Sequence, residues 1–458
     1  MNGETSRRLP LGTLAWAAAA AAVTLVFVAA VPLVGAVLGA AIVVYALVAW
    51  SLRRPELLLV GCLGAAALGS VSAVGGVSGA SLTIYQGVFF VAVIVYCWLV
   101  LDGRERLVHT PADLWLLLLL AAALTALPAA ADVRMGLAAF VSLTSSVLLA
   151  FLVVGVATSA ARLRAALVAF LLIAAFLGCL AVLEHFRIFA VQAYYSTSLD
   201  GIRARTTFKD PNIFGGVLAA AAALGIPLAA AERRFFRAAF LWAAVAAAAI
   251  GVAMSLSRGA FLGLALGSLV AVCIAPMRWT VRIALIAAGL AAAFLLLTVV
   301  LSPGWVAAKI TGIASNDSAR YRIYLANSAW HIFSAHPFGV GPGNFDQAIG
   351  AYRDPRVPAN LLESHTTYLT ILVEDGFLGL IGIVAAVTVA LWSAAKTALG
   401  KVPAELRTLA SAALAGLVVL VVQSMTYSLD TSKFFWFLIG ASLAVASIAR
   451  GAKAREVP

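Results

Sequence analysis

Four short segments between residues 203 and 368 place arginine or histidine beside strongly apolar sequence. They are Arg203-Ala-Arg205 with the nearby Lys209-Asp-Pro-Asn212, Ser257-Arg258-Gly259, Arg320-Tyr-Arg322, and His365-Thr-Thr-Tyr368. A guanidinium group offers a planar fork of donors that suits phosphate, and a histidine can take up a proton near neutral pH. The residue types therefore predict a site that binds an anion and moves a proton.

The first segment, with Arg203, Arg205 and Lys209, leads into a turn. Asp-Pro-Asn at 210–212 predicts the start of a helix that runs from Ile213 onwards. Guanidinium groups and the unpaired N–H groups of a helix start would face the same anion, so Asn212 also belongs to the candidate set. A solvated loop whose arginines pair with lipid phosphate is the alternative.

Arg258 stands between two very apolar segments, and no acidic residue lies within ten positions of it on either side. An arginine this close to hydrocarbon is costly unless it meets an anion, which makes Arg258 a candidate site residue. Snorkelling of the side chain to a lipid headgroup is the simpler alternative.

The segment around Arg322 fits an amphipathic helix over 318–334 that lies on the membrane, with Tyr324 and Trp330 as interface anchors. The Gly/Pro run at 337–343 predicts a tight irregular turn after it. Aromatic side chains in such a segment more often serve packing than binding.

His365 is placed where a long polar segment meets the next apolar run, so its ring could act as a general base. Glu374, a few turns deeper with Asp375, could orient the ring or hold a polar cavity, and Glu363 is another nearby base. A single histidine at a membrane interface is more often structural. No spacing of His, Cys and carboxylates indicates a metal, and the four cysteines, all within apolar runs, are interpreted as small core residues without disulfides.

Composition defines the elements that must position these residues. Of 458 residues, 64% are hydrophobic and 11% are charged, which is far more apolar than a water-soluble domain. The apolar runs lack the alternation of barrel strands, so they must be helices that satisfy their own backbone groups in lipid. The sequence predicts an all-α, polytopic transmembrane helical bundle.

About twelve to fourteen spans are expected, at roughly 20 residues each. They are placed near 12–30, 32–50, 56–74, 82–101, 113–131, 138–157, 164–184, 213–231, 237–255, 259–275, 281–301, 366–395, 408–427 and 432–449.

Positive charge sets the expected orientation in the cytoplasmic (inner) membrane. With both termini cytoplasmic, every inner connection carries at least two basic residues, for example Arg53 with Arg54 and Arg162 with Arg164. The net charge of +12 is therefore explained by orientation and by anionic membrane lipid, and a nucleic-acid partner is not expected.

This threading divides the chain and leaves two long extracytoplasmic loops, which hold most of the candidate residues. The expected parts are N-terminal transmembrane helices at 1–184, an extracytoplasmic loop at 185–212, transmembrane helices at 213–301, a long extracytoplasmic loop at 302–365, C-terminal transmembrane helices at 366–449 and a cytoplasmic tail at 450–458.

The candidate segments together resemble the O-antigen ligase and O-antigen polymerase superfamily, which includes bacterial protein O-oligosaccharyltransferases. The resemblance covers roughly 200–380 and depends on the order of Arg205 with Phe208 and Pro211-Asn212, Ser257-Arg258-Gly259, Arg322 with His336-Pro337 and the Gly-rich turn, and His365 with Tyr368-Leu369 and Glu374-Asp375-Gly376. Tyr324-Leu-Ala after Arg322 is a departure, since a tryptophan is common there in relatives.

The resemblance implies a GT-C-like membrane glycosyltransferase that needs neither metal nor cofactor. It would transfer a glycan from a polyprenyl-diphosphate (undecaprenyl-diphosphate type) carrier to an acceptor hydroxyl, on the extracytoplasmic face, in polysaccharide biosynthesis of the cell envelope. It assigns Arg205, Arg258 and Arg322 to the donor diphosphate and neighbouring sugar and His365 to activation of the acceptor. The supporting candidates in the sequence are Arg203, Lys209, Asn212, Glu363, Tyr368 and Glu374.

The sequence leaves open whether the acceptor is a glycan, a lipid or a protein. The alternative from another class is a transporter, such as a flippase for lipid-linked oligosaccharides. A flippase should show internal repeats and charge on both sides of a central cavity, whereas these polar segments are predicted on one face.

Overall fold

The computed structural model describes residues 48–69, 73–77, 80–189, 191, 196–198, 201–295, 317–357 and 364–456. The predicted span at 12–30, nearly all of the span at 32–50, and Glu363 lie outside these ranges.

Eight helices among the described residues are long and apolar enough to cross a membrane, which confirms a polytopic all-α membrane protein. They are α4 (Ile84–Leu101), α6 (Val133–Val156), α7 (Ala160–His185), α8 (Pro211–Ala231), α9 (Phe235–Ser255), α16 (Gly376–Leu399), α17 (Ala404–Ser424) and α18 (Lys433–Glu456). Shorter apolar helices are α3 (Glu56–Ala67), α5 (Asp113–Ala126), which a short 3₁₀ turn η2 (Leu127–Ala129) follows, α10 (Arg258–Ile274) and α11 (Trp279–Leu295). The described strands form two antiparallel hairpins, β1 (Ala73–Val77) with β2 (Ala80–Thr83), and β3 (Ser196–Ser198) with β4 (Gly201–Arg203).

Polar residues cap the starts of several of these helices. The side chains of Asp132, Ser159, Asp210 and Ser257 accept hydrogen bonds from the first N–H groups of α6, α7, α8 and α10. A capping side chain satisfies backbone donors that a helix start would otherwise leave unpaired. Asp210-Pro211 begins α8 as the sequence predicts.

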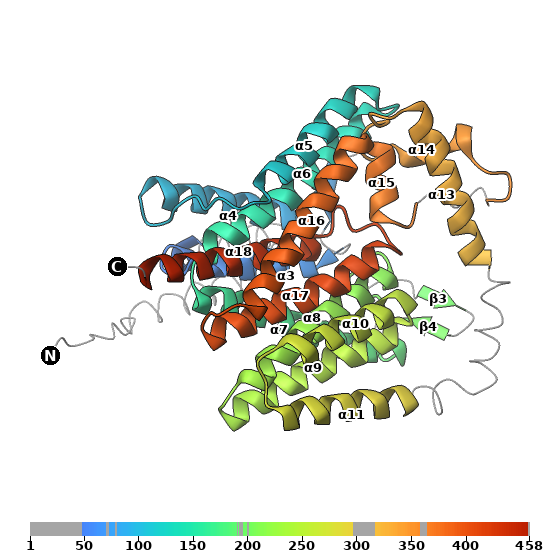
Figure 1. Ribbon diagram of the computed structural model, residues 1–458. Coiled ribbons are helices and arrows are strands. Elements are labelled where there is room, and N and C mark those ends of the chain that lie inside the picture. Colours follow the sequence, from blue (N-terminus) through green and yellow to red (C-terminus); the bar gives the residue numbers. More distant parts are fainter. Residues whose placement is uncertain are drawn as a thin grey trace, which may run out of the picture.

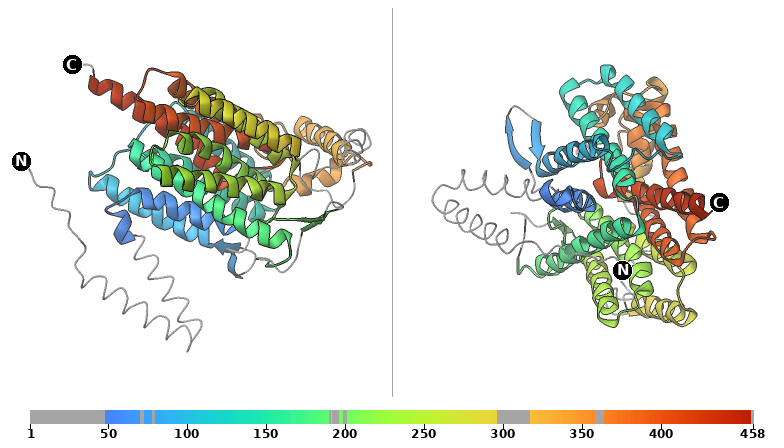
Figure 2. Two further views of the ribbon diagram at one scale, coloured as in Figure 1. Left: turned by 90° about the horizontal axis from the view of Figure 1, so that it is seen from below. Right: turned by 90° about the vertical axis from the view of Figure 1, so that its left-hand side faces the viewer.

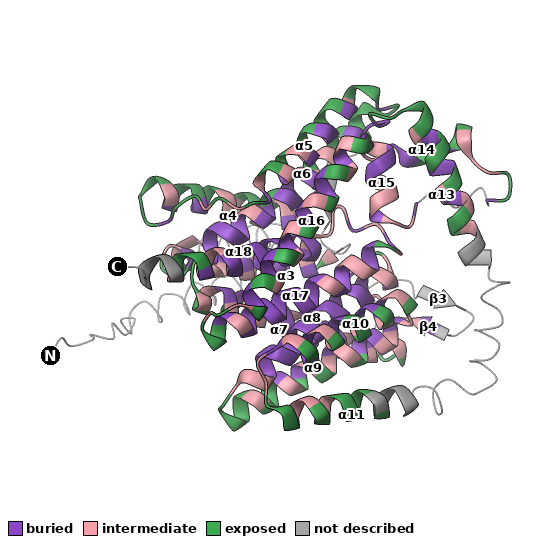
Figure 3. Ribbon diagram, viewed as in Figure 1, coloured by how far each residue is buried: buried purple, intermediate pink, exposed green. Residues whose placement is uncertain are grey.

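Helix α8 lies in the middle of the bundle and is buried along nearly its whole length, as is most of α17 (Figures 1 and 3). Alanine and glycine dominate α8, and a Cβ on Gly216 would lie 2.8 Å from the side chain of Gln423 on α17. Small side chains let helix backbones approach closely, which is the main route to tight packing where lipid offers no hydrophobic drive.

The cysteines correct one prediction. Cys62 is buried, but Cys97, Cys179 and Cys273 are exposed on the outside of the helices. An apolar run in a membrane protein faces either the protein or the lipid, and composition alone does not distinguish these faces. The interpretation of all four as core residues was therefore wrong for three of them.

The predicted single span at 366–395 is two helices, α15 (Thr367–Glu374) and α16. The break falls at Gly376, whose backbone has a φ of +72°, a conformation that favours glycine. A Cβ here would collide with the backbone of Pro337 and Phe338. The Gly-rich turn after α13 packs against this break, so a distant segment ends the helix.

Helix α13 (Asp317–Ala335), close to the predicted range, and α14 (Phe345–Tyr352) pack with α15 into a unit that we name the outer cap, comprising residues 317–357 and 364–375. It has its own apolar core, made by Leu325, Ala329, Ile332, Val340, Phe345, Ile349, Val357 and Val373. Figures 1 and 2 show the cap and the β3–β4 hairpin at one end of the bundle, with the C-terminal end of α18 at the other. We name the cap's end the site end.

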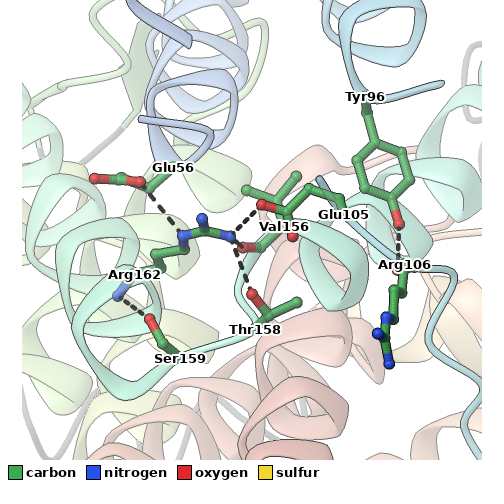
Figure 4. A network of polar contacts seen from close by, with 8 residues as sticks. All are labelled: Glu56, Tyr96, Glu105, Arg106, Val156, Thr158, Ser159 and Arg162. Atoms are coloured by element: carbon green, nitrogen blue, oxygen red, sulfur yellow. Dashed lines mark hydrogen bonds and ion pairs between the residues drawn. The ribbon is translucent and has the colours of Figure 1, made fainter. Parts of the chain in front are cut away.

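Arginines of predicted inner connections gather at the opposite end of the bundle. Figure 4 shows Arg162 joining four segments: its guanidinium donates to Glu105 at 2.6 Å, to the Val156 carbonyl at 3.3 Å and to Thr158 at 3.0 Å, and lies 3.8 Å from Glu56. Arg164 pairs with Glu232 there at 2.9 Å. The basic residues predicted to lie inside the cell and those predicted to lie outside are therefore at opposite ends of the helices.

We expect the site end to face out of the cell. In a variant that lacks the native cysteines, Gly350→Cys on α14 should react in intact cells with a membrane-impermeant maleimide, because an exposed outer segment meets the reagent directly. Phe235→Cys, exposed at the start of α9, should react only after the membrane is permeabilised. Labelling of position 235 in intact cells would reverse the orientation.

Candidate functional site

The site end brings together the starts of α8 and α10, the end of α17 and the outer cap. Arg203, the last residue of β4, donates from Nε to the Ser255 carbonyl at 3.1 Å and from a terminal nitrogen to Asn212 Oδ1 at 2.8 Å. Arg203 therefore links the β3–β4 hairpin to the end of α9 and the start of α8. These hydrogen bonds indicate that Arg203 positions the segments around the site.

Glu184, near the end of α7, fixes the backbone of the arginine segment. Its buried carboxylate accepts hydrogen bonds from the N–H groups of Thr206, at 2.7 Å, and Arg205, at 3.3 Å. Thr206 has a φ of +43°, an uncommon conformation for a residue other than glycine. The sequence analysis did not identify Glu184, whose only signal was a carboxylate at the end of a very apolar helix.

We expect Glu184→Ala to lower the free energy of unfolding by about 1–3 kcal/mol, because two buried N–H groups would lose their acceptor. Donor binding should weaken too, since the same backbone carries Arg205. Thermal unfolding followed by tryptophan fluorescence tests the first effect. Glu184→Gln, which keeps one acceptor oxygen, should show a smaller loss, and equal stability of the alanine variant and the wild type would refute the role.

Arg205 and Lys209 flank the turn that enters α8. A terminal nitrogen of Arg205 donates to the Lys209 carbonyl at 3.1 Å, while the Lys209 side chain is exposed. Gln423 on α17 donates to the Asn212 carbonyl at 3.1 Å. This hydrogen bond joins the start of α8 to the end of α17. Tyr427 lies in the loop that follows α17.

Arg258 begins α10 and Arg322 lies on α13, both with exposed side chains, and the charge of one acts on the other. Partial burial, and next the positive charge of Arg258, lower the pKa of Arg322. Neither arginine has a hydrogen bond or a carboxylate partner among the described residues. Two guanidinium groups that repel each other, one of them at the N-terminus of α10, have the chemistry to bind an anion.

His365 precedes α15 and adopts a φ of +54°, a left-handed conformation in which histidine is several-fold enriched. Its ring centroid lies 6.0 Å from that of Tyr427. Thr367 holds the two segments together, since its hydroxyl donates to the Tyr427 carbonyl at 3.1 Å and accepts from the Leu429 N–H at 2.8 Å. His365 thus lies against the loop after α17, and Gln423 connects that helix to Asn212 and Arg203.

Glu374 and Tyr368 have structural partners. The carboxylate of Glu374 accepts from the N–H groups of Gly343, at 2.7 Å, and Phe345, at 3.2 Å, and so it holds the Gly-rich turn and the start of α14. The Tyr368 hydroxyl accepts from Ser424 at 3.1 Å. The described contacts of Glu374 therefore serve the outer cap, rather than the imidazole of His365.

A polar cluster beside the site was absent from the sequence interpretation. Lys433 donates to Ser146 Oγ at 2.5 Å and to the Ser142 carbonyl at 3.1 Å, and lies 4.9 Å from the centre of the Tyr85 ring. Asp430 in the preceding loop accepts from Ser428 at 2.7 Å, and burial raises the pKa of Asp430. Lys433 lines a cavity of about 270 Å³ together with Tyr85 and Phe208.

Comparison with known proteins identified one matching family. Residues 242–384 match the family model described as O-antigen ligase, which confirms the resemblance to the O-antigen ligase and polymerase superfamily. The matched segment contains Arg258, Arg322 and His365, whereas Arg203 and Arg205 precede it. Curated proteins gave no match.

Proposed function

Because residues 242–384 carry an O-antigen ligase domain, we propose that this multi-pass membrane protein transfers a glycan from a polyprenyl-diphosphate carrier to an acceptor hydroxyl. The reaction takes place at the site end, on the outer face of the cytoplasmic membrane. Arg205, Arg258 and Arg322 bind the diphosphate and the neighbouring sugar, and His365 activates the acceptor.

The transfer exchanges one bond to the anomeric carbon of the donor sugar for another. The acceptor oxygen attacks this carbon, and the bond to the diphosphate oxygen breaks. Negative charge develops on the polyprenyl diphosphate as it leaves. Guanidinium groups already in place stabilise that charge in the transition state, which is the role that a metal ion has in other phosphate sites.

The acceptor hydroxyl must lose its proton during the attack. The His365 imidazole takes this proton. The ring lies beside Tyr427 in the loop after α17, at the end of the bundle that we assign to the boundary between water and bilayer. An acceptor from the aqueous side and a donor anchored in lipid both reach this boundary. Arg203, Asn212 and Glu184 position the arginine segment, and Tyr368 and Glu374 support the region around His365.

The observation that carries the proposal is the pair of Arg258 and Arg322, which lie near each other without a carboxylate partner among the described residues. Both side chains are exposed, so an anionic ligand can reach them, and its negative charge would offset the repulsion between the two guanidinium groups. A diphosphate carries two negatively charged phosphate groups on one molecule. The lipid carrier anchors the diphosphate in the membrane, level with the start of α10.

Purified protein in lipid nanodiscs provides the test. Incubation with polyprenyl-diphosphate-linked glycan and the host's acceptors should release polyprenyl diphosphate and form a glycosylated acceptor, at a rate that EDTA leaves unchanged. Movement of the intact donor across a vesicle membrane, without release of polyprenyl diphosphate, would instead identify a flippase.

A further inference from the structure

The outer cap contains a second cavity, distinct from the arginine pair. Its volume is about 420 Å³, within the usual range for small-ligand pockets. Helix α13 forms one wall and the segment after α14 forms the other; the lining includes Asn327, Trp330, His331, Tyr352, Arg353 and Asp354. The donor and acceptor roles proposed above use none of these residues.

The lining combines a flat apolar surface with many hydrogen-bonding groups. The Trp330 side chain is 58% exposed and is not among the residues of the cap's apolar core. An amide, a phenol, an imidazole and a guanidinium surround it. A sugar ring has a C–H face that packs on an aromatic ring and hydroxyl groups that need donors and acceptors, so the lining matches a saccharide.

The far wall is built to be rigid. Asp354 accepts from Arg356 through both carboxylate oxygens, at 2.9 and 2.7 Å, and its own N–H donates to Ser328 on α13 at 3.0 Å. The Arg356 guanidinium also lies 3.9 Å from the centre of the Tyr324 ring. A wall held in this way positions polar groups before a ligand arrives, which lowers the entropic cost of binding.

Arg353 retains an unused donor in this wall. Its Nε is buried and has no hydrogen-bond partner among the described residues. A buried donor without a partner is unfavourable, so a ligand that binds this guanidinium and accepts from it would stabilise the wall. Arg356 already neutralises Asp354, which leaves the positive charge of Arg353 available to a sugar hydroxyl or carboxylate.

The distance between the cavity and Arg322 suits the length of a short oligosaccharide. Trp330 follows Arg322 by eight residues on α13, which corresponds to about 12 Å along the helix axis. A short oligosaccharide spans this length. Helix α13 can therefore bind the diphosphate of the donor at Arg322 and a saccharide farther along, at Trp330.

We propose that the cavity between α13 and the segment after α14 is a saccharide subsite, in which a sugar ring stacks on Trp330 while Asn327, Tyr352 and Arg353 bind its polar groups. The subsite deepens the proposed glycan transfer, because it holds part of a glycan away from the reacting bond. The glycan can come from the donor or from the acceptor, and both sources share this chemistry.

Binding of oligosaccharide without its lipid tests the subsite directly. The probe is the oligosaccharide that mild acid releases from the host's polyprenyl-diphosphate carriers, which has neither lipid nor diphosphate. Saturation-transfer NMR with the protein in nanodiscs should detect binding by the wild type. Trp330→Ala should raise the Kd about tenfold, because it removes the stacking surface.

Two variants control for changes in folding. Trp330→Phe keeps an aromatic face and should bind within about threefold of the wild type, which is under 1 kcal/mol. Phe338→Ala removes another exposed aromatic side chain of the same cap and should leave the Kd unchanged. Equal affinity of Trp330→Ala and the wild type, or no binding by the wild type, would overturn the subsite.

Release of polyprenyl diphosphate separates this inference from the proposed function. If the wild type transfers glycan but oligosaccharide binding does not depend on Trp330, the subsite fails and glycan transfer stands. If binding depends on Trp330 but no transfer occurs, the subsite stands and the transfer fails. Competition by oligosaccharide from the host's acceptor, compared with that from the carrier, identifies which glycan occupies the subsite.

Discussion

Replacement of His365 by asparagine is expected to reduce the rate of glycan transfer by about 10²–10⁴, the usual contribution of a positioned general base. Asparagine is the sharper substitution because it tolerates the left-handed backbone conformation at this position, whereas alanine adds strain. The measurement is the initial rate of polyprenyl diphosphate release at saturating donor. The affinity for donor should change little, because the arginines bind the diphosphate.

The matched control is His336→Asn. This histidine belongs to the same outer cap, where its Nε2 lies 3.4 Å from the Tyr352 hydroxyl. Its replacement should leave the rate within a few-fold of the wild type. A His365→Asn variant with near-normal turnover would contradict the assignment and direct the search to His331, His336 or Glu363. A lower melting temperature with a normal rate per folded molecule would assign His365 a structural role.

Replacement of Arg258 by alanine is expected to weaken donor binding by about 1.5–3 kcal/mol, the usual strength of a charge-assisted contact. This corresponds to roughly tenfold to 150-fold in Kd. Equilibrium binding of polyprenyl diphosphate to the protein in nanodiscs measures it. Arg258→Lys should recover only part of the affinity, since lysine keeps the charge but loses the fork of donors.

The arginine pair gives a second signature. Because Arg258 and Arg322 repel each other without ligand, Arg258→Ala should not destabilise the ligand-free protein, even though donor binding weakens. Arg278→Ala, an exposed arginine beside α11 at the opposite end, should change neither quantity. Unchanged donor affinity in both Arg258→Ala and Arg322→Ala would remove the pair from the site.

The sequence by itself determined that this is a helical membrane protein and where most helices begin. Long apolar runs leave the backbone no partner in lipid except itself, so length and composition are sufficient to predict a helix. The start at Asp210-Pro211 was predictable because a cap acts over only a few residues, and Ser257 caps α10 in the same local way. Arg258 stood out for a similar local reason, since its whole neighbourhood is apolar.

Only the tertiary structure decided how the site is held together. Glu184 binds the backbone of Thr206, Gln423 binds Asn212, and Glu374 binds Gly343, and each pair joins residues far apart in the chain. The break between α15 and α16 belongs to this class as well, because local sequence permits a continuous helix and the Gly-rich turn that packs on Gly376 comes from another segment. Hydropathy likewise could not distinguish a helix face that meets lipid from one that meets protein, since both are apolar, and the exposed Cys97 shows the consequence.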